Sequence, residues 1–95
     1  MSRRPGHLHK KRGRGKFYIY LRESFRNGDK VENINIYSFG KMPGALEFLY
    51  SIREDYSLFP EELLKKGYNL DDLDEWIMTL ETQVTGTGRE FKLTN

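Results

Sequence analysis

The chain of 95 residues has no cysteine, only three prolines and no long apolar segment. The absence of cysteine excludes disulfides, thiolate chemistry and cysteine-based zinc sites. No run approaches the roughly 18 apolar residues that cross a membrane, and no apolar stretch follows the basic N-terminus. We therefore expect a small soluble protein of the cytoplasm, with neither a membrane anchor nor a secretory signal.

Aromatic side chains, in contrast, are plentiful. They make up 14% of the chain, as six Phe, six Tyr and one Trp, while hydrophobic residues make up 37% and charged residues 32%. A disordered chain has few aromatic residues, so this composition predicts a folded domain with one modest core.

Charge is distributed unevenly along the chain. Residues 1–16 contain seven basic side chains and no acid, whereas residues 17–95 contain nine basic and fourteen acidic side chains, a net charge of −5. Such asymmetry favours a partner of opposite charge, and the basic end should contact phosphate. Residues 1–15 have few apolar side chains and several glycines, so we expect a flexible basic arm.

Residues 16–26 and 30–39 predict a β-hairpin, because β-branched and aromatic residues flank Asn27-Gly28, a strong signal for a two-residue turn. This turn would pair Arg26 with Asp29 and Leu21 with Ile34, which sorts the side chains onto two faces. The expected core face comprises Phe17, Ile19, Leu21, Phe25, Ile34 and Ile36. The expected outward face comprises Lys16, Tyr18, Tyr20, Arg22, Ser24, Arg26, Val31, Asn33, Asn35, Tyr37 and Phe39.

Helical spacing of apolar residues predicts three helices, over about 45–56, 60–66 and 70–84. Pro60 suits the start of the second helix, Gly67 its end, and Asn69 the N-cap of the third. Residues 89–93 fit either a third strand or a loose tail. The predicted fold class is α+β: a single domain over residues 16–95, with the N-terminal β-hairpin (16–39) packed against two or three C-terminal helices and a tail over 85–95.

The hairpin also resembles a known sequence pattern. Its elements are Gly15-Lys16, the aromatic strand Tyr18 to Leu21, Glu23-Ser24-Phe25-Arg26, the turn Asn27-Gly28, Lys30-Val31 and the closing Phe39-Gly40. Over 28 of the 95 residues the chain is similar to the N-terminal segment of insertion-sequence transposases of the DDE type. More loosely, it resembles the arm-binding domains of phage integrases, which bind DNA with sheet residues. The chain stops where the catalytic domain of a transposase would begin, so the resemblance implies a DNA-binding accessory domain without the nuclease.

Together these features predict a small non-catalytic nucleic-acid-binding protein of a phage or mobile element, with DNA favoured over RNA. The arm would hold phosphates, and the outward hairpin face would contact the groove or the bases, since Arg and Asn hydrogen-bond well to guanine and adenine. The predicted contact residues are Arg3, Arg4, Lys10, Lys11, Arg12, Arg14, Lys16, Tyr18, Tyr20, Arg22, Asn33, Asn35 and Tyr37.

The alternative function is a protein-interaction inhibitor or adaptor that engages a host nucleic-acid-processing enzyme through acidic helices. Its candidate residues are Glu61, Glu62, Asp71, Asp72, Asp74 and Glu75. An ordinary solvated helix face with acids near the helix N-termini accounts for the same residues.

Catalytic and cofactor motifs receive no support from the sequence. His7 and His9 have a spacing that could ligate a metal, but no third ligand type is near them on the expected arm, so no metal site is predicted. No nucleophile–base pair, acidic metal loop or phosphate-binding loop stands out, and we expect neither an enzyme nor a cofactor.

Overall fold

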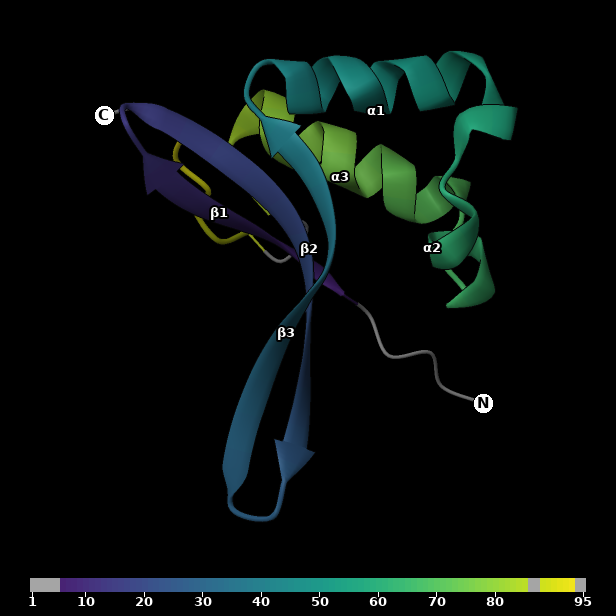
Figure 1. Cartoon of the computed structure of the whole chain (residues 1–95). Helices are drawn as coiled ribbons and strands as arrows, with labels where there is room; N and C mark the ends of the chain where they lie inside the picture. The colour runs from purple at the N-terminus through teal and green to yellow at the C-terminus, as the bar shows by residue number, and fades with distance from the viewer. Residues whose placement is uncertain (1–5, 86–87, 94–95) are drawn as a thin grey trace. The chain divides into compact units, whose positions relative to one another are not determined.

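The computed structural model describes residues 6–85 and 88–93 and confirms the α+β class (Figure 1). Three antiparallel strands come first along the chain and the helices follow. The chain divides into two compact units, Met1–Met42 and Pro43–Asn95. The strands fall in the first unit and the helices in the second.

The first unit is a sheet with the strand order β1-β2-β3, formed by β1 (His7–Gly13), β2 (Lys16–Asn27) and β3 (Lys30–Lys41). Strand β1 lies within the segment that we expected to be a flexible arm. It pairs along its whole length with β2, from His7 opposite Arg22 to Gly13 opposite Lys16. Arg14 and Gly15 both have positive φ, as a type I′ turn between paired strands requires.

The predicted hairpin exists, but its predicted register is wrong. Gly28 and Asp29 form the turn in place of Asn27 and Gly28, so Asn27 pairs with Lys30. Of the two turn residues only Gly28 has positive φ, at 68°, which is the pattern of a type II′ turn. Moving the turn by one position shifts each cross-strand pair near it by two residues, which leaves the alternation of the two faces unchanged there.

Two bulges then change the alternation toward the other end of the hairpin. The pairing passes over Ile36 and Phe39 of β3, since Arg22 pairs with Asn35, and Ile19 pairs with Gly40. Each extra residue moves the following side chains of β3 to the opposite face. Phe39, which we expected on the outward face, is therefore only 6% exposed and is buried like Ile19 and Leu21.

The predicted core face is correct only in part. Ile19 and Leu21 are fully buried, and Phe17 and Ile36 are half-buried. Phe25 and Ile34, in contrast, are 37% and 51% exposed. The first residue of β1, His7, lies opposite Arg22, and β2 and β3 continue beyond this point (Figure 1). Phe25 and Ile34 lie in this part of the hairpin, which has only two strands.

The second unit contains α1 (Gly44–Glu54), the short 3₁₀ helix η1 (Tyr56–Leu58), α2 (Glu61–Lys65) and α3 (Leu70–Thr82). The three predicted helices are confirmed with boundaries shifted by one or two residues. Asn69 caps α3 as predicted, because its side chain accepts the backbone N–H of Asp71 while Asp72 accepts that of Asn69. Within the described residues, no helix is long and apolar enough to cross a membrane.

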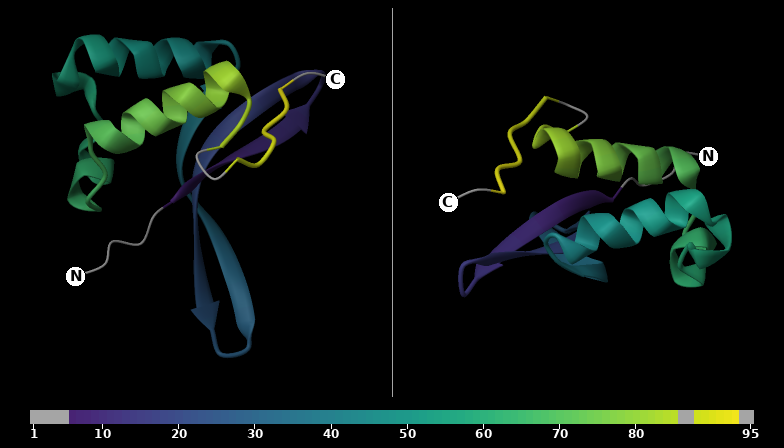
Figure 2. Two further views of the ribbon diagram at one scale, coloured as in Figure 1. Left: turned by 180° about the vertical axis from the view of Figure 1, so that it is seen from behind. Right: turned by 90° about the horizontal axis from the view of Figure 1, so that it is seen from above.

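Helices α1 and α3 lie side by side in both views of Figure 2 and supply most of the core of this unit. The Trp76 ring packs between the rings of Phe59 and Tyr68, with centroids 6.3 and 5.7 Å away. The Tyr50 hydroxyl of α1 donates to the carboxylate of Glu81 in α3. The buried side chains of the three α-helices are Ala45, Leu49, Ile52, Leu63, Leu73, Trp76, Ile77, Thr79 and Leu80.

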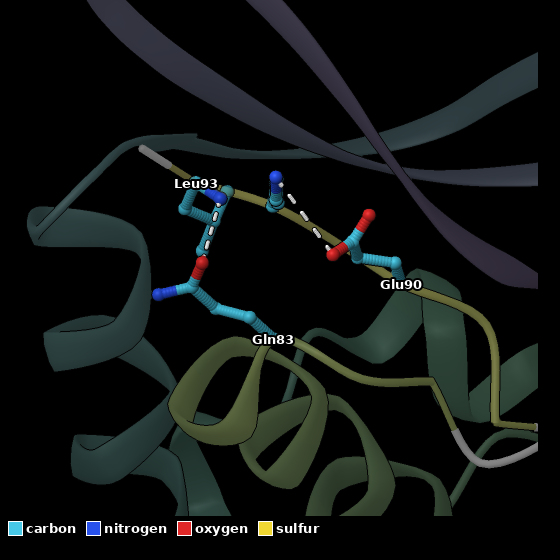
Figure 3. Close-up of polar contacts among 4 residues, drawn as sticks. Gln83, Glu90 and Leu93 are labelled. Atoms are coloured by element: carbon cyan, nitrogen blue, oxygen red, sulfur yellow. Dashed lines mark hydrogen bonds and ion pairs between the residues drawn. The ribbon is translucent and has the colours of Figure 1, made fainter. Parts of the chain in front are cut away.

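Residues 89–93 do not add a strand to the sheet. The chain reverses after α3 at Gln83, whose φ is 60°, and Val84 then forms an isolated bridge with Glu90. The Gln83 carbonyl accepts the N–H of Phe91, and its side-chain oxygen accepts the N–H of Leu93 at 2.9 Å (Figure 3). The third strand of the sheet therefore comes from the N-terminus, and the C-terminal segment pairs with the residues that follow α3.

Candidate nucleic-acid interface

One side of the three-stranded sheet carries polar, aromatic and basic side chains and none of the buried apolar ones. Successive residues of a strand point to opposite faces, and residues directly opposite on neighbouring strands point to the same face. The register therefore defines the members of this surface, which we name the polar face. Its members are His7, His9, Lys11, Gly13, Lys16, Tyr18, Tyr20, Arg22, Ser24, Arg26, Val31, Asn33, Asn35, Ser38 and Lys41.

The polar face has five permanently charged side chains, and all of them are basic: Lys11, Lys16, Arg22, Arg26 and Lys41. The three acids of the first unit lie elsewhere. Glu23 and Glu32 point to the opposite face of the hairpin, and Asp29 is in the turn. A phosphate group approaching the polar face thus meets positive charge without a neighbouring carboxylate.

Tyr18 lies at the centre of one end of this face. Its cross-strand neighbours are Lys11 on β1 and Lys41 on β3, both of which are exposed. A Cβ atom placed on Gly13 would lie 3.5 Å from the Tyr18 ring, so the ring extends over this glycine. A half-buried tyrosine with a lysine opposite it on each neighbouring strand combines a stacking surface for a base with two contacts for phosphates.

Two histidines follow along β1 on the same face. His9 lies opposite Tyr20, and His7 lies opposite Arg22. Burial lowers the pKa of both imidazoles below the ordinary value of 6.5, and the charge of Arg22 lowers it further. His9 is also affected by His7 and Lys11. Both rings are therefore neutral at pH 7 and gain a proton only in more acidic solution.

Cross-strand hydrogen bonds order the polar side chains beyond these histidines. The Arg22 Nε donates to the Asn35 side-chain oxygen at 2.9 Å, and the Ser24 hydroxyl donates to that of Asn33. The bond to Asn35 uses one of the five N–H donors of a guanidinium, and an amide whose oxygen accepts such a bond still has the two N–H donors of its NH₂ group. This row can donate hydrogen bonds to a ligand that supplies acceptors.

Of the thirteen residues predicted to contact nucleic acid, seven share this face. They are Lys11, Lys16, Tyr18, Tyr20, Arg22, Asn33 and Asn35.

Tyr37 is not on this face, which corrects its predicted position. It pairs with Leu21 on the side that contains the buried residues, and its ring centroid is 5.1 Å from that of Phe39. The bulge at Ile36 is the cause, since one extra residue reverses the alternation between Asn35 and Tyr37.

The basic residues of the expected arm are also divided between the faces. Lys10 and Arg12 pair with Ile19 and Phe17 on the side opposite the polar face, and the Lys10 ammonium lies 5.4 Å from the centre of the Phe17 ring. Arg14 is exposed in the turn between β1 and β2. Arg3 and Arg4 lie outside the described residues.

Sequence reasoning missed several members of the polar face. Lys41 lay outside the predicted hairpin, and His7 and His9 were interpreted as part of a solvated arm. Their placement depends on β1, whose sequence HLHKKRG lacks the alternation of apolar and polar residues that marks a strand. The Gly15 that follows Arg14 was the one local signal for a turn at this point.

The two units differ more in net charge than do residues 1–16 and residues 17–95, the segments compared in the sequence. Residues 1–42 hold eleven basic and three acidic side chains, a net charge of +8, and residues 43–95 hold five basic and eleven acidic ones, a net charge of −6. Residues 1–16 supply seven of these eight net positive charges, because residues 17–42 hold four basic and three acidic side chains.

Several acids proposed for a protein partner have structural roles in the helices. The Asp72 carboxylate accepts the backbone N–H of Asn69 in the cap of α3, and Glu61 forms an ion pair with Lys65 at 3.4 Å. Asp71 also lies in the first turn of α3 and Glu62 in that of α2, where acids stabilise a helix. Of the six candidate acids, only Asp74 and Glu75 lie outside a helix cap, a first turn or an ion pair. The six acids together therefore give limited support to an acidic docking surface.

Within residues 6–85 and 88–93, no group of three or more His, Asp or Glu side chains is placed to hold a metal ion. Comparisons with protein-family models, curated proteins and solved structures found no match to the chain. The polar face therefore provides the basis for a functional hypothesis.

Proposed function

We propose that this protein binds nucleic acid through the polar face of its sheet. The observation that carries the proposal is the arrangement of five basic side chains, two tyrosine rings and two asparagine amides on one face that holds no carboxylate. Basic groups release counterions from the phosphate backbone, and tyrosine rings and amides contact bases. The resemblance of the hairpin to transposase segments agrees with a non-catalytic role in a phage or mobile element.

The salt dependence of binding gives the proposal a magnitude. If all five basic side chains neutralise one phosphate each, the logarithm of the binding constant falls with the logarithm of salt concentration with a slope of about −4.5. Raising the salt fourfold, from about 50 to 200 mM, should then weaken binding roughly 500-fold.

A matched pair of variants tests which face binds. The double variant Lys11→Gln/Lys41→Gln removes the two charges beside Tyr18, whereas Arg12→Gln/Lys30→Gln removes two charges from the opposite face. Fluorescence anisotropy with a labelled 20-base-pair DNA duplex should show a slope near −2.7 for the first variant and a nearly unchanged slope for the second. On a 20-nucleotide single strand, the same loss of two contacts should change the slope from about −3.5 to about −2.1. Equal effects of the two variants, or no binding by the unaltered protein, would refute the proposal.

A further inference from the structure

The part of the hairpin beyond β1 has only two strands. It comprises residues 23–27 and 30–34 with the turn Gly28-Asp29, and we name it the distal ribbon. Its five cross-strand pairs correspond to a length of roughly 15 Å at about 3.3 Å per residue. Figure 1 shows β2 and β3 continuing together past the end of β1. Neither strand of this ribbon pairs with a further strand of the sheet on its outer edge. The strand order places β3 at one edge of the sheet, and the pairing of β1 with β2 begins at His7, opposite Arg22.

The two faces of the distal ribbon differ in charge. The face that continues the polar face carries Ser24, Arg26, Val31 and Asn33, and it joins the Arg22–Asn35 pair at its base. The opposite face carries Glu23, Phe25, Asn27, Lys30, Glu32 and Ile34, so its two carboxylates outnumber its single ammonium group. A polyanion can therefore approach the ribbon closely on one face and is repelled on the other.

An isolated two-stranded hairpin is marginally stable in water, and this one exposes apolar side chains. Val31 is 59% exposed on the polar face, beside Asn33 and Arg26. A surface that contacts the ribbon should thus offer a small apolar group among hydrogen-bond acceptors. The major groove of DNA has this combination, since thymine presents a methyl group while guanine and adenine present acceptors to Arg and Asn.

The dimensions of the ribbon discriminate among nucleic acids. Two strands about 4.8 Å apart, with their side chains, fit a major groove about 12 Å wide and do not fit a minor groove about 6 Å wide. Same-face pairs recur every two residues, or about 6.7 Å, which is close to two base-pair steps of B-form DNA at about 3.4 Å each. The deep, narrow major groove of an RNA duplex excludes such an element.

From this geometry we infer that the distal ribbon enters the major groove of double-stranded B-form DNA with the Arg22–Asn35 and Ser24–Asn33 pairs toward the base edges. The inference rests on the proposed function and specifies its ligand as duplex DNA. Glu23 and Glu32 then face away from the groove, and the three-stranded part of the polar face contacts the flanking phosphates.

The test uses the full chain and four probes of one mixed 20-base-pair sequence. They are plain duplex DNA, duplex DNA with glucosylated 5-hydroxymethylcytosine filling the major groove, plain duplex DNA with netropsin in the minor groove, and duplex RNA. Anisotropy at about 100 mM salt should give at least tenfold weaker binding to the glucosylated DNA and to the RNA than to plain DNA. Netropsin should change the affinity less than twofold.

A pair of asparagine variants adds a readout on the ribbon itself. Asn33 lies on the polar face and Asn27 lies on the opposite face of the same ribbon. On a duplex selected from a randomised library, Asn33→Ala should weaken binding about tenfold, as loss of a base contact does, and Asn27→Ala should change it less than twofold. Circular dichroism confirms that both variants keep the sheet.

The outcomes separate the two proposals. Equal affinity for plain and glucosylated DNA, equal affinity for duplex DNA and RNA, or equal effects of the two asparagine variants would overturn the ribbon inference and leave the proposed function standing. Absence of binding to every probe, and to the single strand used above, would overturn both.

Discussion

Protonation of His7 and His9 should strengthen nucleic-acid binding as the pH falls. Both imidazoles lie on the polar face, where their cross-strand neighbours are Arg22 and Tyr20, and Lys11 follows His9 on the same face of β1. Burial and the charge of Arg22 lower both pKa values below 6.5, so the free protein carries neutral rings at pH 7. A bound phosphate favours the charged form of each ring, and binding is therefore coupled to proton uptake in acidic solution.

The size of this effect follows from the charge count of the polar face. Each protonated imidazole that neutralises one phosphate steepens the salt slope by about 0.9. Two such rings should change the slope from about −4.5 at pH 7.5 to about −6.3 in solution acidic enough to protonate both. Affinity at a fixed salt concentration should rise as the pH falls below 6.5.

Anisotropy titrations of the labelled duplex at several pH values measure this change, with His7→Gln/His9→Gln as the control. The variant keeps a polar side chain at both positions and cannot gain the charge, so its slope should stay near −4.5. Carboxylates of the chain titrate alike in both proteins and cancel in the comparison. If the variant steepens as much as the unaltered protein does, the histidines do not contact phosphate and the reasoning fails.

Two further predictions concern stability. Gly28→Ala should destabilise the protein by about 1–2 kcal/mol in chemical unfolding, because φ is 68° at this position and no atom lies within 4 Å of an added Cβ to offset the backbone cost. The control is Gly44→Ala, which is equally open but starts α1 with an ordinary φ, and it should be neutral or stabilising. Equal losses of stability in the two variants would contradict this reasoning. Asn69→Ala should cost about 0.5–2 kcal/mol because it removes the side-chain oxygen that accepts the Asp71 N–H, and an unchanged unfolding midpoint would show that the cap of α3 contributes nothing.

The same histidines should make folding weakly dependent on pH. A pKa lowered by folding means that the unfolded chain binds more protons below pH 6.5, so folding stability falls as the pH decreases through this range. The loss should be smaller in His7→Gln/His9→Gln. The unfolding control also defines the pH range over which the binding data describe folded protein.

The helical unit was largely predictable from the sequence, because its signals are local. Asn69 with Asp72 three residues later specifies the start of α3, and Gly67, whose φ is 99°, follows the end of α2. Of the apolar positions that predicted the third helix, Leu73, Ile77 and Leu80 are buried with Trp76 beside them, whereas Leu70 and Val84 are each 43% exposed. The hairpin was also predictable as an element, since a Gly turn joins two β-rich segments.

Pairing between strands was decided only by the tertiary structure. Strand β1 is basic and lacks an apolar alternation, so its hydrogen bonds to the edge of β2 create a strand that its own sequence does not indicate. The bulges at Ile36 and Phe39 depend on how β3 aligns with β2, and they move Tyr37 and Phe39 away from the polar face. Side-chain identity and charge thus follow from the sequence, whereas the face that each strand residue occupies depends on register, because a shift of one residue reverses every side chain beyond it.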